Sequence, residues 1–308
     1  MGQNPTHDLH SGWQTVLRSA LRSEPPRLLL IGEGHGFLSL IIGMSQSRLP
    51  LEVHSPDEES NTLARDLGIG LHSNLDRWVT ENPGGLIVSS GWRKIVPEKL
   101  LSQANFTNIH YAAFPKYRGM HSIVWALLNG ERSIAVTFHE MSAHVDAGPI
   151  IWQKRIRARS LSSWQLMEHC DDAIQKRIGR VLRLYVAGFL KPRKQLETRA
   201  TYVTKRNKED CRVNWKEWDA LMFRRYLRAL VEPYPLPFFE WKGQELQIVK
   251  ARVTSKRYFQ TTGVVVDVRH DTSFVKLKGG ILELQVLRHP ELGDVTAASI
   301  LFRPGMRL

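Results

Sequence analysis

The 308-residue sequence contains only two cysteines and no long apolar run. Cys170 and Cys211 lie far apart and form no CxxC pair, so the sequence predicts neither a disulfide framework nor a cysteine-ligated zinc. No apolar run is long enough to cross a membrane, and the polar segment 1–10 lacks the apolar core of a secretory signal. These absences predict a cytoplasmic protein with no membrane partner.

Positive charge is abundant, and its distribution is uneven. The formal net charge is +13, and residues 191–308 alone hold 23 Lys and Arg against 13 Asp and Glu. Such an excess favours a polyanion such as RNA, an anionic substrate, or a basic surface with no partner. Net charge alone leaves all three open.

Apolar runs alternate with helical patterns over the first two thirds of the chain. Residues 27–31 and 85–90 contain short continuous apolar runs, which are typical of buried parallel strands, and residues 106–110 form a further predicted strand with polar residues near its end. A helical pattern over 11–22 precedes them, and further helical patterns separate them. This alternation predicts an α/β, Rossmann-like domain with a mostly parallel sheet over residues 1–190.

The C-terminal third has a different pattern. The stretch 191–212 is polar and basic, as linkers often are, and 308 residues exceed the usual length of one domain. Residues 213–308 show one helical segment and then short strand patterns separated by Gly and Asp turns. We therefore expect a linker followed by a small β-barrel-like, OB-like domain.

Three polar residues follow predicted strands of the first domain. Asn108 and His110 are two positions apart at the end of the strand 106–110, so they share one face. Asp146 lies in a glycine-bounded loop one helix and one strand later. An amide can stabilise an oxyanion, an imidazole can move a proton, and a carboxylate can orient that imidazole. The sequence predicts that these residues meet beyond the carboxyl ends of the strands.

Other motifs are incomplete. The third glycine of a dinucleotide loop beginning at Gly32 would fall on Phe37, so a plain strand-to-helix turn is favoured. The segment His139–His144 resembles HExxH but has one residue too many and follows a strand pattern. We find neither a serine nucleophile elbow nor a Walker loop, and we predict no metal centre.

The segments Asn108-Ile-His110, Pro115-Lys-Tyr-Arg-Gly119 and Asp146-Ala-Gly148 resemble motifs of the N10-formyltetrahydrofolate-dependent formyltransferases. That family includes methionyl-tRNA formyltransferase, the glycinamide ribonucleotide enzyme and aminosugar N-formyltransferases. The likeness is strongest over residues 85–155, and it departs from the family at Tyr111–Phe114, where the family has Pro-Ser-Leu-Leu.

The resemblance implies that Asn108, His110 and Asp146 are catalytic and that N10-formyltetrahydrofolate is the co-substrate, with no metal. It implies folate-binding roles for residues in two loops: Ser89, Gly91, Trp92, Ile95, Val96, Glu140, Met141 and His144. It implies substrate-binding roles for residues of the loop after His110: Tyr111, Lys116, Tyr117, Arg118 and Gly119.

The formyl acceptor is less closely defined. Because the loop signatures of the tRNA enzymes are absent and His121–Trp125 is closer to sugar-type relatives, the expected acceptor is the amino group of a nucleotide-linked amino sugar. The basic C-terminal third leaves Met-tRNA as an alternative, and another small amine such as hydroxyornithine is a third. A degenerate homologue that only binds its ligands, and a homodimer, also stay open.

Overall fold

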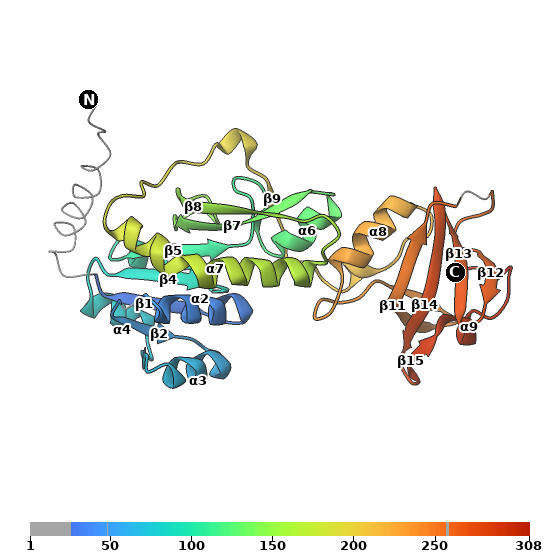
Figure 1. Ribbon diagram of the computed structural model, residues 1–308, viewed down its shortest axis with the longest axis horizontal. Helices are drawn as coiled ribbons and strands as arrows, with labels where there is room; N and C mark the ends of the chain where they lie inside the picture. Colours follow the sequence, from blue (N-terminus) through green and yellow to red (C-terminus); the bar gives the residue numbers. More distant parts are fainter. Residues whose placement is uncertain (1–25, 48, 257–258) are drawn as a thin grey trace, which may run out of the picture. The chain divides into compact units, whose positions relative to one another are not determined.

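The computed structural model describes residues 26–47, 49–256 and 259–308, so the helix expected over 11–22 lies outside the described residues. The chain forms two compact units (Figure 1). The first comprises the described residues up to 118, then 135–156 and 167–202; the second comprises 119–134, 157–166 and 203–308. The chain therefore passes between the units several times, and two short stretches before residue 190 belong to the second unit.

The first unit is built on a seven-stranded sheet with the order β3-β2-β1-β4-β5-β7-β8. Its strands are β1 (Leu28–Gly32), β2 (Leu51–His54), β3 (Gly70–Leu71), β4 (Leu86–Ser90), β5 (Asn105–His110), β7 (Ser133–Glu140) and β8 (Ile150–Arg157). Strands β1 to β5 pair in parallel, whereas β7 is antiparallel to β5. The predicted mostly parallel sheet is confirmed. The strand order reverses between β1 and β4. Open α/β sheets commonly bind their ligands beyond the carboxyl ends of the strands at such a reversal.

Helices flank this sheet (Figure 1). They are α2 (His35–Ser45), α3 (Glu58–Asp66), α4 (Leu75–Glu81), α5 (Glu98–Leu101) and α7 (Ser163–Val186). Alternate residues of β1 point to opposite faces, and Leu29 and Ile31 join a buried cluster with Trp78 of α4. Helices α2 and α7 approach closely at Gly43, where a Cβ would lie 2.8 Å from the Ile178 side chain.

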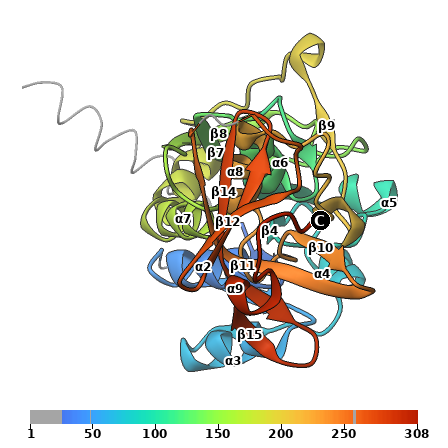
Figure 2. The ribbon, with the colours of Figure 1, turned by 90° about the vertical axis from the view of Figure 1, so that its right-hand side faces the viewer.

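The second unit contains an antiparallel sheet with the order β10-β11-β14-β13-β12, and β15 pairs with β14. Its strands are β10 (Phe238–Trp241), β11 (Gln244–Thr254), β12 (Val265–Arg269), β13 (Thr272–Leu277), β14 (Gly280–His289) and β15 (Gly293–Thr296). Its helices are α6 (Ser122–Leu128), α8 (Ala220–Ala229) and α9 (Ala297–Ile300). Phe223 of α8 and Leu284 of β14 are fully buried in one core, and α9 lies beside β15 (Figure 2). The expected fold class, an α/β domain followed by a small β domain, is confirmed.

The remaining elements are short. Strands β6 (Arg118–Gly119) and β9 (Tyr202–Val203) pair with each other, and two 3-10 helices cover Glu197–Arg199 and Glu209–Cys211. Among the described residues, no helix combines the length and the apolar character needed to span a bilayer.

Candidate active site

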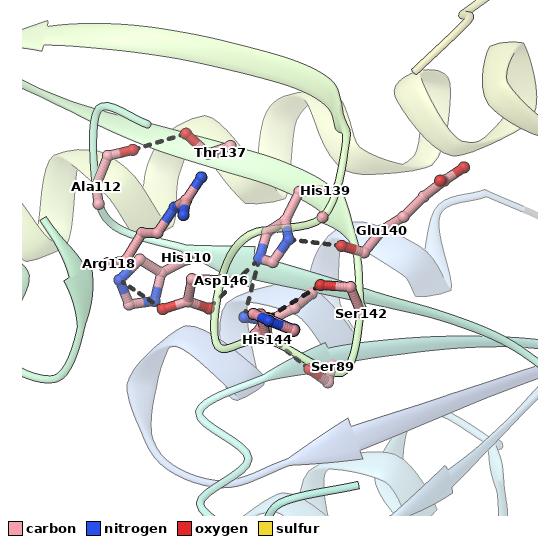
Figure 3. Close-up of polar contacts among 12 residues, drawn as sticks. Ser89, His110, Ala112, Arg118, Thr137, His139, Glu140, Ser142, His144 and Asp146 are labelled. Atoms are coloured by element: carbon pink, nitrogen blue, oxygen red, sulfur yellow. Dashed lines mark hydrogen bonds and ion pairs between the residues drawn. The ribbon is translucent and has the colours of Figure 1, made fainter. Parts of the chain in front are cut away.

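Strand register brings polar side chains to both sides of Asn108. In the sheet Asn108 lies opposite Ser89 of the parallel strand β4 and opposite His139 of the antiparallel strand β7. Ser89 Oγ donates a hydrogen bond of 2.6 Å to Asn108 Oδ1, and Asn108 Nδ2 lies 3.3 Å from His139 Nε2 (Figure 3). The Asn108 amide is therefore held from both of its ends.

The protonation state of His139 fixes the direction of these hydrogen bonds. Burial lowers the pKa of His139 to about 4, although the nearby Asp146 carboxylate acts in the opposite direction. The neutral ring must donate from Nδ1, because its partner at 2.8 Å is the Glu140 carbonyl oxygen, which can only accept. His139 Nε2 is then the acceptor for one Asn108 amide proton, and the second amide proton can be donated to a ligand.

Asp146 lies between two histidines. Its Oδ2 is 3.7 Å from His110 Nε2, and its Oδ1 is 3.7 Å from His139 Nε2 (Figure 3). Because His139 is neutral at pH 7, it forms no ion pair with this carboxylate. Both distances are too long for a hydrogen bond, and the buried His110 Nε2 has no hydrogen-bond partner among the described residues.

An aromatic side chain supports the two imidazoles. The Phe114 ring stacks on His110 with centroids 5.3 Å apart, and its plane is nearly perpendicular to the ring of His139 at 5.0 Å. Phe114 belongs to the segment that departs from the formyltransferase motif. The departure thus places a large ring directly against the predicted proton-transfer residue. Within the described part of the chain, no group of three or more His, Cys, Asp or Glu side chains could hold a metal ion.

Comparison with known proteins shows the family to which this chain belongs. A family model described as "Formyl transferase" matches residues 70–181, and one described as "Formyl transferase, C-terminal domain" matches residues 205–303. Together they cover more than half of the chain. The chain belongs to the formyl transferase family. The family resemblance seen in the sequence is confirmed.

Several solved structures share the fold of this chain. HypX from Aquifex aeolicus in complex with tetrahydrofolic acid is 19% identical with a TM-score of 0.64, over 91% of this chain and 47% of that chain. This chain thus spans about half the length of HypX. An N-formyltransferase from Helicobacter canadensis in complex with folinic acid and dTDP-3-aminofucose is 16% identical, with a TM-score of 0.70. The match covers 84% of this chain and 98% of that chain. WlaRD, a sugar 3N-formyl transferase whose structure was solved with dTDP and 5-N-formyl-THF, is 15% identical, with a TM-score of 0.68. The match covers 87% of this chain and 98% of that chain.

The residues predicted to bind folate lie in varied environments. Trp92, Val96 and Met141 pack, partly buried, against the core cluster that includes Trp78, whereas Ile95 is 86% exposed. The Ser89 hydroxyl donates its hydrogen bond to Asn108. Gly91 has a φ of 70°, and a Cβ there would lie 2.3 Å from the Glu33 carbonyl oxygen, so the turn after β4 requires glycine.

The other predicted folate residues follow β7. The Glu140 carboxylate accepts a hydrogen bond of 2.8 Å from Tyr185 on α7, and burial raises the pKa of Tyr185. The His144 carbonyl oxygen accepts one of 3.0 Å from Ser142 Oγ (Figure 3). Glu140 and His144 thus begin and shape the loop that carries Asp146.

The residues predicted to bind substrate divide into two groups. Lys116 is exposed, and Tyr117 and Gly119 are half-buried. Arg118 is fully buried, and the Tyr111 hydroxyl donates to Asp171 of α7. Arg118 and the Tyr111 hydroxyl therefore face other parts of the first unit, and a direct contact of Arg118 with substrate would require this segment to rearrange.

Sequence reasoning missed two residues at the site, His139 and Gln195. His139 lies in the failed zinc motif and at the start of the loop that the resemblance assigns to the folate pocket, but no pattern in the sequence places it beside Asn108. That position follows once β7 is known to be antiparallel. Gln195 lies in the stretch expected to be a linker, and its side chain hydrogen-bonds the loop that carries Asp146. No local signal distinguishes it from other linker residues.

The buried, neutral His139 predicts a specific dependence of stability on pH. Its pKa is about 4 in the fold and about 6.5 in an unfolded chain. The unfolded chain therefore binds more protons between these values, and the free energy of unfolding falls as pH drops through them. Between pH 7 and pH 5 we expect the free energy of unfolding to fall by about 2 kcal/mol less in His139→Gln than in the wild type.

Urea unfolding at the two pH values measures this difference. His270→Gln, at an exposed histidine of the second unit, serves as the control and should keep the wild-type pH dependence. Equal losses in wild type and His139→Gln would contradict a neutral His139.

Proposed function

We propose that this formyl transferase moves a formyl group from N10-formyltetrahydrofolate to a primary amine at the site formed by Asn108, His110 and Asp146. The observation that carries the proposal is the meeting of these side chains, from β5 and the loop after β7, around the buried His110 Nε2. The matches to formyl transferase models in both parts of the chain support the reaction class. The folates in the HypX and WlaRD structures, which share this fold, support the formyl donor.

The chemistry of the residues fits a folate. Trp92, Val96 and Met141 offer a partly apolar surface to a flat ring system, and Ile95 leaves a large apolar side chain uncovered. When bound, the folate supplies the formyl group. The protein supplies the surface that orients it and the polar groups that act on the formyl carbon.

The proposed reaction is a direct transfer. The amine nitrogen forms a bond to the formyl carbon, the bond from that carbon to folate N10 breaks, and the amine proton passes to the departing nitrogen through His110. The Asn108 amide proton that is not bound to His139 stabilises the charge that develops on the formyl oxygen. Asp146 orients the His110 imidazole and stabilises its charged form while it holds the proton.

For the acceptor, we propose the amino group of a nucleotide-linked amino sugar. Two of the structures that share the fold contain dTDP or dTDP-3-aminofucose, and this chain matches 98% of each of them. Met-tRNA is the second candidate, because residues 191–308 hold 23 Lys and Arg against 13 Asp and Glu. The salt dependence of binding separates the two, since affinity for a polyanion falls steeply with salt.

A panel of acceptors tests the proposal. The purified protein would be incubated with N10-formyltetrahydrofolate and, separately, with dTDP-, UDP- and GDP-linked amino sugars, Met-tRNA and hydroxyornithine. Mass spectrometry should show one formyl group added to a nucleotide sugar and not to the other amines. Formylation of Met-tRNA alone would overturn the acceptor assignment, and formylation of none of them would count against the reaction itself.

A further inference from the structure

The loop that presents Asp146 has a backbone conformation that requires support. Asp146 has a φ of 53°, in the left-handed region, which costs a non-glycine residue roughly 1 kcal/mol or more. The loop is closed by a hydrogen bond of 2.9 Å from the Glu140 amide to the Pro149 carbonyl. Gly148 packs against the start of the loop so closely that a Cβ would lie 1.9 Å from the Glu140 carbonyl oxygen.

One side chain outside the loop holds its backbone. Gln195 Nε2 donates hydrogen bonds of 2.8 Å to the Asp146 carbonyl and 2.7 Å to the Gly148 carbonyl. Both protons of this amide are therefore used on either side of Ala147. Gln195 is 9% exposed, so water competes little for these contacts.

The other end of the same amide is held by Arg118. Gln195 Oε1 accepts from Arg118 Nε at 3.2 Å and from Nη2 at 3.0 Å. Because carbonyls only accept and a guanidinium only donates, a single orientation of the Gln195 amide satisfies both sides.

Arg118 is itself fixed. It is fully buried, and its guanidinium also donates to the Glu197 carboxylate at 2.9 and 2.6 Å and to the Tyr202 hydroxyl at 2.8 Å. The hydrogen bond from Arg118 lowers the pKa of Glu197. The segment that carries these partners is tied down at its start, where Arg193 and Ile150 exchange backbone hydrogen bonds of 2.8 and 3.0 Å.

We propose that Gln195 is a positioning residue of the transfer reaction: with Arg118, it holds the backbone of Asp146 so that the carboxylate faces His110. The inference rests on the proposed function, because the position of Asp146 matters for turnover only if Asp146 acts there. The contact also links Asp146 to the loop of Lys116 and Tyr117, since Arg118 follows them directly. Gln195 thereby joins the two segments that are predicted to face the formyl donor and the amine.

The substitution Gln195→Glu is the sharpest test. It keeps the size of the side chain and an acceptor for Arg118, but it removes both donors and places a carboxylate oxygen against two carbonyls. We expect kcat to fall roughly tenfold to a hundredfold, as a small misplacement of a catalytic group does, with KM for the folate within about twofold of wild type. The control is Gln175→Glu. Gln175 lies in the same unit, and its Nε2 donates a hydrogen bond of 3.1 Å to Ser39 Oγ and not to the loop of Asp146. This variant should keep the wild-type kcat.

Two further measurements separate positioning from general support. In an Asp146→Asn background, Gln195→Glu should lower kcat no further, because its effect passes through Asp146. Hydrogen exchange of the backbone amides of 141–148 should be faster in Gln195→Glu and unchanged in Gln175→Glu, and this readout does not depend on turnover.

Failure of the positioning role can be told apart from failure of the proposed function. Wild-type kcat in Gln195→Glu, or effects of Gln195→Glu and Asp146→Asn that multiply, would overturn the positioning role while transfer itself stands. If the wild-type protein transfers no formyl group, the proposed function falls. The exchange measurement alone then decides whether Gln195 holds this loop.

Discussion

Replacing His110 by Ala is expected to lower kcat for formyl transfer by roughly 10² to 10⁴, the usual contribution of a general acid–base residue. His110 is the imidazole that we propose carries the amine proton to folate N10, and its Nε2 lies 3.7 Å from Asp146 Oδ2 with no hydrogen-bond partner among the described residues. KM for the folate should change little, because the imidazole acts on the reacting atoms and does not hold the pterin. Stopped-flow measurement of tetrahydrofolate formation gives both constants.

A surface histidine provides the control for this variant. His169 is exposed on α7, and His169→Ala should keep wild-type kcat. Circular dichroism would establish that His110→Ala is folded. A folded His110→Ala with more than half of the wild-type kcat would remove His110 from the mechanism.

Replacing Asn108 by Ala is expected to lower kcat by roughly 10² to 10³, the effect of removing one donor that stabilises a developing oxyanion. Its amide is already oriented by Ser89 on one side and His139 on the other, so little reorganisation is needed during the reaction. Asn108→Asp should be at least as damaging, because it replaces the amide donor by a second acceptor.

The same strand offers a matched control for this variant. Asn105 is exposed at the start of β5, where its Nδ2 donates 2.9 Å to the Gly84 carbonyl. Asn105→Ala should keep wild-type kcat and cost only stability. Equal kcat values for Asn108→Ala and Asn105→Ala would show that the oxyanion is stabilised elsewhere.

The sequence predicted those parts of the fold that local patterns determine. Continuous apolar runs located β1 and β4 to within one or two residues, and the strand predicted over 106–110 lies within β5. Asn108 and His110 could be placed together because two residues on one strand end share a face. The loop of Asp146 could be placed beyond the same strand ends, the family resemblance implied the catalytic role of Asp146, and the structure brings its carboxylate to 3.7 Å from His110.

Long-range pairing determines the rest, and no local pattern reports it. Nothing in the residues of β7 distinguishes an antiparallel strand from a parallel one, so the place of His139 beside Asn108 could not be predicted. The stretch 191–212 has the composition of a linker. Gln195 is nevertheless buried, and its hydrogen-bond partners Asp146 and Arg118 lie 49 and 77 residues away in the sequence. The composition of a segment indicates how soluble it is. Whether the segment has a fixed structure depends on which distant groups form hydrogen bonds with its polar atoms.

The segment Tyr111–Phe114 illustrates the same point. Its sequence departs from the family, which marked it as the least predictable part of the site. In the structure its first residue is held by the Tyr111 hydroxyl on Asp171, and its last by Gln153 Nε2, which donates 3.3 Å to the Phe114 carbonyl. Between them, the Thr137 hydroxyl donates 2.6 Å to the Ala112 carbonyl. The segment that departs from the family motif is therefore a fixed loop, and it brings Phe114 against His110.

The most direct test of formyl transfer by Asn108, His110 and Asp146 is a single-turnover reaction with isotopically labelled formyl on the folate. Enzyme in excess over N10-formyltetrahydrofolate, mixed with a nucleotide-linked amino sugar, should move the label to the amine at the rate at which tetrahydrofolate forms. Asp146→Asn should slow both events together. Tetrahydrofolate formation without labelled product, or an Asp146→Asn rate equal to that of wild type, would contradict the account.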